Sequence, residues 1–140
     1  METWQYIWRN GFAPLLPTLG LEALRKALKR DDSRILQGAT TYPLAVKPNR
    51  LEPIKACCAL SYCGWRGESL NSVGEIEQHF DEICAEAGNR LGHPEACRPF
   101  LEWYDTTPRS AMRFGLLGEI DRTLNERFRV AVTRAVRNAA

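Results

Sequence analysis

The residues of this sequence best suited to bind a metal are its cysteines and histidines. Cys58, Cys63, His93 and Cys97 supply the thiolate and imidazole ligands that a structural zinc ion prefers. Four residues separate Cys58 from Cys63 and three separate His93 from Cys97, but the sequence has no Cys-x2-Cys pair. A buried cysteine is also an ordinary small apolar residue. We therefore take zinc binding as a third hypothesis and otherwise expect no cofactor.

A catalytic thiol would need a helix N-terminus or a neighbouring cation to lower its pKa. Pro53 suits the first turn of a helix, which we predict to run through Tyr62. That helix would hold Cys57 and Cys58 in its interior and Cys63 at its C-terminal end, where the helix dipole raises a thiol pKa. The sequence therefore assigns no catalytic residue, and it favours a non-enzymatic function over an enzyme.

Carboxylates and one imidazole recur at helical spacing in Glu75, His79, Glu82 and Glu86, which would share one side of a helix. A di-metal site in a helical bundle uses Glu-x-x-His on two helices. This sequence has Glu-x-x-x-His, and only once. We interpret the set as an exposed acidic face, on which Glu75, Glu82 and Glu86 are candidate contacts with a partner protein.

Basic residues gather in two stretches, one at the end of 18–30 and one after residue 107. Arginine, the only cation in the second stretch, binds phosphate and base edges through its planar fork. However, Glu119, Asp121 and Glu126 interrupt that stretch, and cations at the end of a helix also balance its dipole. Nucleic-acid binding is therefore the alternative hypothesis, and its candidate residues are Arg25, Lys26, Lys29, Arg30, Arg122 and Arg129.

The net charge of +2 conceals three segments of alternating sign. Residues 1–67 carry ten basic and five acidic side chains, residues 68–106 carry two and nine, and residues 107–140 carry seven and three. An acidic helix packed on basic helices would satisfy this pattern within the fold. The charge pattern therefore does not require a polyanionic partner.

Hydrophobic periodicity and capping signals predict about five to six helices. Ser72 and Glu75 form a capping box, and Gly92 is a stop signal for the helix that follows them. Thr107 and Pro108 begin a long C-terminal helix, whose end at 134–140 we expect to fray. The predicted helical ranges are 3–10, 18–30, 53–62, 72–91, 94–105 and 107 to the tail.

Trp4 and Trp8 lie one helical turn apart in the first predicted helix, with Ile7 beside them. Two exposed indoles are unusual, so this helix must pack on something. One interpretation places both indoles in the core of this chain. The other places them in the groove of a partner, which makes Trp4 and Trp8 candidate contact residues.

The range 39–53 contains three prolines, which exclude a helix interior and disfavour a central strand. We therefore predict a long Pro-rich loop. Tyr42, Leu44 and Val46 indicate that this loop is ordered and packed against the rest of the chain.

A length of 140 residues fits a single domain. No apolar run reaches the roughly 18–20 residues of a membrane span, and the first residues lack the order of a signal peptide. We therefore expect a cytoplasmic chain with reduced cysteines and no membrane partner. As a whole, the sequence predicts one all-α domain over 1–140, a helical bundle that acts as a small accessory module and docks on a partner protein or on a second copy.

Overall fold

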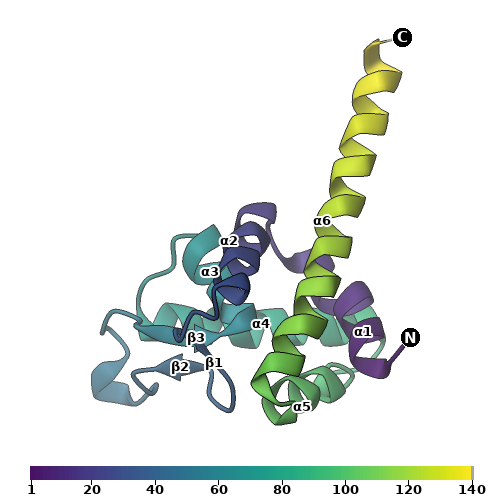
Figure 1. Ribbon diagram of the computed structural model, residues 1–140. Coiled ribbons are helices and arrows are strands. Elements are labelled where there is room, and N and C mark those ends of the chain that lie inside the picture. Colours follow the sequence, from purple (N-terminus) through teal and green to yellow (C-terminus); the bar gives the residue numbers. More distant parts are fainter. Residues whose placement is uncertain (140) are drawn as a thin grey trace.

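The computed structural model describes residues 1–139 and is mostly helical, as predicted (Figure 1). A small three-stranded sheet accompanies the helices, so the fold is not purely α. Within the described residues, the α-helices are α1 (Thr3–Ile7), α2 (Thr18–Lys29), α3 (Ala59–Gly67), α4 (Val73–Leu91), α5 (Arg98–Thr106) and α6 (Arg109–Ala139).

The sheet consists of β1 (Ile35–Leu36), β2 (Thr41–Tyr42) and β3 (Ala56–Cys58), in the order β1-β3-β2. The central strand β3 is parallel to β1 and antiparallel to β2, and Cys57 is paired with Ile35 on one side and with Thr41 on the other. The predicted helix over 53–62 is therefore wrong in its first half. All three residues of β3 are buried, and pairing on both edges outweighs the local helical signal.

The Pro-rich range 39–53 contains β2 and a short 3-10 helix, η3 (Lys47–Asn49), which begins with proline in its first turn. The expected packing of this range is not seen at its apolar residues. Tyr42, Leu44 and Val46 are 59%, 65% and 49% exposed. Its order comes instead from the pairing of β2 with the central strand.

At the N-terminus, helical backbone continues beyond residue 10, where the first predicted helix ends. The α-helical turn α1 leads into a π-helical turn, η1 (Trp8–Phe12), and a 3-10 turn, η2 (Ala13–Leu15). A Cβ at Gly11 would lie 2.9 Å from Cδ1 of Leu91 on α4. Glycine thus lets the wide turn pack directly on α4, and this contact keeps the chain helical where the local signal predicts a stop.

Phe100 of α5 lies at the centre of an aromatic cluster that joins α5 to the N-terminal helical turns. Its ring lies 6.0 Å from that of Trp8 and 5.1 Å from that of Phe12. Trp4 stacks on Trp103 with ring centroids 3.6 Å apart and planes within 4°. Aromatic pairs of this kind contribute about 0.5–1.5 kcal/mol beyond their buried area, so this cluster holds the N-terminal turns against α5.

The predicted limits of α4 are confirmed. The Ser72 hydroxyl accepts a hydrogen bond from the Glu75 amide, the Glu75 carboxylate accepts one from the Ser72 backbone amide, and Gly92 ends the helix with φ of +105°. By contrast, α5 begins at Arg98 and not at Pro94, because the chain from 93 to 97 forms turns beneath Gly88.

The C-terminal helix α6 is one continuous element, and its second half leaves the body of the molecule (Figure 1). Its first half packs on α2 and on the N-terminal turns, with Met112, Leu116 and Ile120 buried. From residue 128 to residue 139 every side chain is exposed. The predicted frayed end at 134–140 is helical through Ala139, and residue 140 lies outside the described residues.

Candidate docking surface

The structure places both predicted tryptophan contacts in the core. Trp4 is 6% exposed and Trp8 is fully buried. Nε1 of Trp8 donates to the Thr123 hydroxyl at 3.2 Å, and Nε1 of Trp4 donates to the Glu2 carboxylate. Their faces are covered by α5, so this arrangement leaves them no surface to offer a partner.

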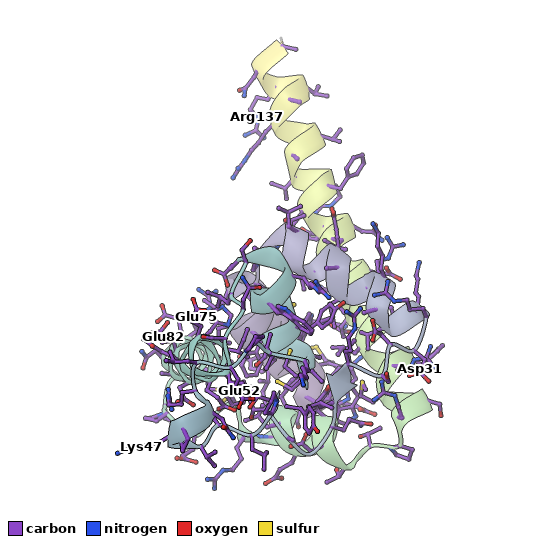
Figure 2. All side chains as sticks on the ribbon, turned by 90° about the vertical axis from the view of Figure 1, so that its left-hand side faces the viewer. Asp31, Lys47, Glu52, Glu75, Glu82 and Arg137 are labelled. Atoms are coloured by element: carbon purple, nitrogen blue, oxygen red, sulfur yellow. The ribbon has the colours of Figure 1, made fainter. Side chains whose placement is uncertain are left out.

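The acidic face of α4 is exposed as predicted. Glu75, Glu82 and Glu86 are all exposed, and Figure 2 shows Glu75 and Glu82 on the same side of the body. Hydrogen bonds from the hydroxyl and backbone of Ser72 lower the pKa of Glu75, so this carboxylate also serves the helix cap. Glu82 accepts a hydrogen bond from Gln78 at 3.1 Å.

The four candidate zinc ligands do not converge: among residues 1–139, no group of three or more metal-ligating side chains could hold an ion. Cys58 lies at the start of α3 with its Sγ 3.3 Å from the Ser61 hydroxyl, and Cys63 is buried inside the same helix. His93 is exposed. Cys97 instead approaches Cys84, whose carbonyl oxygen lies 3.8 Å from its Sγ.

Cys58 lies at the N-cap of α3, and not in a helix interior as predicted. Its side chain lines a cavity of about 130 Å³, together with Thr40, Phe80 and Tyr104. The Tyr104 hydroxyl accepts a hydrogen bond from the Ala59 amide and donates one to the carbonyl of Leu36. Burial raises the pKa of the Cys58 thiol. The thiol therefore stays protonated at neutral pH, and it is the Tyr104 hydroxyl that joins α5 to the start of α3.

The predicted basic residues of α2 divide into paired and unpaired side chains. Arg25 forms an ion pair with Asp121 of α6 at 2.7 Å, and Arg30 forms one with Asp32 at 2.8 Å. Lys26 and Lys29 are exposed, and neither has an ion pair within residues 1–139.

Three arginines of α6 bind backbone carbonyls. Arg113 donates to the carbonyls of Leu28 and Lys29 at the end of α2, and Arg127 donates to Ala13 at 2.7 Å. Arg109 likewise donates to the carbonyls of residues 32 and 35. These arginines satisfy helix and loop ends that would otherwise lack partners. Of the two predicted nucleic-acid contacts here, Arg129 pairs with Glu126 at 2.5 Å and Arg122 is exposed.

An exposed apolar stripe follows the outer half of α6. Phe128, Val132 and Val136 are 71%, 44% and 67% exposed, while Leu124 at the base is half-buried. Their helical spacing places them on one side of the helix. We call this set the α6 stripe, and its members are Leu124, Phe128, Ala131, Val132, Ala135 and Val136.

A groove of about 610 Å³ lies between α2 and the α6 stripe. Its α2 wall is polar and mainly basic, and its α6 wall is mainly apolar. We call it the α2–α6 groove, and its lining residues are Thr18, Glu22, Arg25, Lys26, Lys29, Leu124, Asn125, Arg127, Phe128 and Ala131.

Of the residues that line this groove, the sequence singled out Arg25, Lys26 and Lys29 as candidate contacts, but none on the α6 wall. The helical period through Leu124, Phe128 and Ala131 was visible, yet such a period usually indicates a core face. The signal that could have found the exposed half was the length of the predicted C-terminal helix, because a helix of 31 residues extends beyond a body of this size.

Comparison with known proteins gives no relative: no protein-family model, curated protein or solved structure matches the chain. Within residues 1–139, no helix combines the length and apolar composition needed to cross a membrane.

Proposed function

We propose that this chain is a non-enzymatic module that docks on a partner protein through the outer half of α6. The observation that carries the proposal is the α6 stripe, an apolar face on a helix that extends away from the body. Contiguous exposed apolar surface of this kind marks interaction sites in folded proteins. Burying one large apolar side chain such as Phe128 contributes about 1.5–3 kcal/mol.

The base of α6 is fixed to the body, which favours docking by a preformed helix. Nε and Nη2 of Arg9 donate to the buried Glu119 carboxylate at 2.7 and 2.9 Å, and Nε2 of Gln5 donates to it at 3.2 Å. This contact raises the pKa of Arg9, mainly through its hydrogen bond to Glu119. A helix held in place before binding loses less conformational entropy when a partner covers it.

The test is co-purification from the native host with the variant Phe128→Asp. We expect the amount of partner that co-purifies with this variant to fall about tenfold or more, because a carboxylate would be buried in an apolar contact. Phe114→Asp is the matched control. Phe114 is 84% exposed on the same helix, about 21 Å from Phe128 along the axis. Full retention of every partner by Phe128→Asp would contradict the proposal.

The alternative function is binding to nucleic acid. Exposed Lys26, Lys29 and Arg122 support it, whereas the ion pairs of Arg25, Arg30 and Arg129 reduce the positive charge offered to phosphate. Binding of the full chain to random DNA and RNA at rising salt tests this alternative. It requires an affinity that falls steeply with salt concentration.

Zinc binding is the third candidate, and elemental analysis of unchelated protein tests it. A stoichiometry near one ion per chain would support it.

We also propose a reducing, cytoplasmic location, which the five free cysteines support.

A further inference from the structure

The two walls of the α2–α6 groove differ in chemistry. On the α2 wall, Arg25 is neutralised by Asp121, but Lys26 and Lys29 are exposed and Glu22 is the only carboxylate that lines the groove. On the α6 wall, Leu124, Phe128 and Ala131 present apolar surface. A segment that fills this groove must therefore be apolar on one side and negatively charged beside it.

The charge of the outer half of α6 disfavours a second copy of this helix as the occupant of the groove. Residues 127–139 contain four arginines and no aspartate or glutamate. Figure 2 shows one of them, Arg137, on the part of α6 that rises above the body. Arg129 is paired with Glu126, so two such helices side by side would bring the other six arginines together, and like charges across an interface are strongly unfavourable.

The shape of the stripe fits a helix as its occupant. Ala131 and Ala135 follow Phe128 at i+3 and i+7, so these two small side chains lie on its side of the helix. From Leu124 to Val136 the stripe covers about 18 Å, or just over three helical turns. A partner helix with large apolar residues at helical spacing would match that length.

We infer that the α2–α6 groove binds an acidic amphipathic helix of a partner protein. This inference rests on the proposed docking function and names the chemistry of its partner. The apolar side of the partner helix covers the α6 stripe, and its carboxylates face Lys26 and Lys29. Opposite charge speeds association and sets orientation, while burial of Phe128 supplies most of the affinity.

The probe is a labelled amphipathic peptide of about 16 residues with leucines at i, i+4, i+7 and i+11 and glutamates beside them. Its counterpart carries lysine in place of every glutamate. Fluorescence anisotropy with the full chain measures both affinities at low and physiological salt. We expect the acidic peptide to bind about tenfold or more tightly than the basic one, with weaker binding as salt rises.

Charge-reversal variants locate the contact. The double variant Lys26→Glu/Lys29→Glu should weaken binding of the acidic peptide about tenfold or more, and Phe128→Asp should do the same. The control is Lys47→Glu/Lys55→Glu, which reverses two exposed lysines outside the groove. Circular dichroism establishes that each variant is folded.

Four results would overturn the inference. The first is equal affinity of the chain for the acidic and the basic peptide, and the second is equal weakening of acidic-peptide binding by Lys47→Glu/Lys55→Glu. The third is displacement of the acidic peptide by DNA that binds at Lys26 and Lys29. The fourth is a dimer, seen in light scattering, that depends on Phe128 and binds no peptide.

A second experiment separates this inference from the docking function. If Lys26→Glu/Lys29→Glu keeps the host partner that Phe128→Asp loses, the acidic-helix inference fails and the docking function stands. If Phe128→Asp keeps the host partner, the docking function itself fails. Loss of the partner from both variants, but not from Lys47→Glu/Lys55→Glu, supports both.

Discussion

At the scale of single residues, burial makes the cysteine thiols unreactive. Burial raises the pKa values of Cys57 and Cys63 far above that of a free thiol. Cys84, half-exposed on α4, is shifted in the same direction by burial. A buried thiol that resists ionisation is a poor nucleophile and acts as a small apolar residue.

These shifts predict a loss of stability in alkali. A thiol pKa that is higher in the folded than in the unfolded chain leaves the free energy of unfolding intact below about pH 8.5 and reduces it as pH rises further. Each such thiol contributes a slope of up to about 1.4 kcal/mol per pH unit. Denaturant unfolding of the reduced chain between pH 7.5 and 9.5 measures that slope.

The variant Cys57→Ala should show a shallower alkaline slope than the natural chain, because one titrating group is removed. Val73→Ala is the control, since it truncates another fully buried side chain but removes no proton. The control should lower stability at every pH without changing the slope. An unchanged slope in Cys57→Ala would show that this thiol does not carry the effect.

At the scale of elements, the contact of α2 with α3 depends on glycine. A Cβ on Gly20 would lie 2.6 Å from the carbonyl oxygen of Cys63, and one on Gly67 would lie 2.7 Å from the backbone of Gly20. Backbone atoms cannot move aside as a flexible side chain can. The two helices therefore pack at a distance that only glycine permits.

We predict that Gly20→Ala destabilises the fold by about 1–3 kcal/mol through overpacking. Gly118→Ala is the matched control, because a Cβ there meets no atom within 4 Å and the residue lies inside α6. That substitution should instead stabilise the helix by up to about 1 kcal/mol. The urea midpoints of the two variants should therefore move in opposite directions, and a shared direction would contradict the packing argument.

At the scale of the whole molecule, α6 has two roles that divide near Arg127. Before this residue, α6 closes the core through Ile120 and the Glu119 contact with Arg9. Arg127 itself donates to Ala13 and to the Thr18 hydroxyl, across the junction of the N-terminal turns with α2. Beyond it, no described side chain is buried.

This division predicts the outcome of a truncation. A chain that ends at Arg127 should keep its thermal midpoint within about 2–4 °C, because surface changes away from the core alter stability by about 0.5 kcal/mol or less. The same truncation should abolish binding of the acidic peptide and of the host partner. A truncated chain that unfolds at a much lower temperature would show that the outer half of α6 supports the fold.

The sequence determined the helical faces and many of their limits. The capping box of Ser72, the stop at Gly92 and the apolar periods of α2, α4 and α6 are local signals, and each of them is realised. Local signals are readable because caps and faces depend on residues within one or two turns.

Only the tertiary structure decided which surfaces of the helices and strands pack against one another. It turned 56–58 into a strand through pairing with β1 and β2, and it buried Trp4 and Trp8 against α5. It also left the α6 stripe uncovered, although that stripe has the same period as a core face. The physical reason is that periodicity shows that a surface is apolar, whereas the atoms that cover it come from distant parts of the chain or from another molecule.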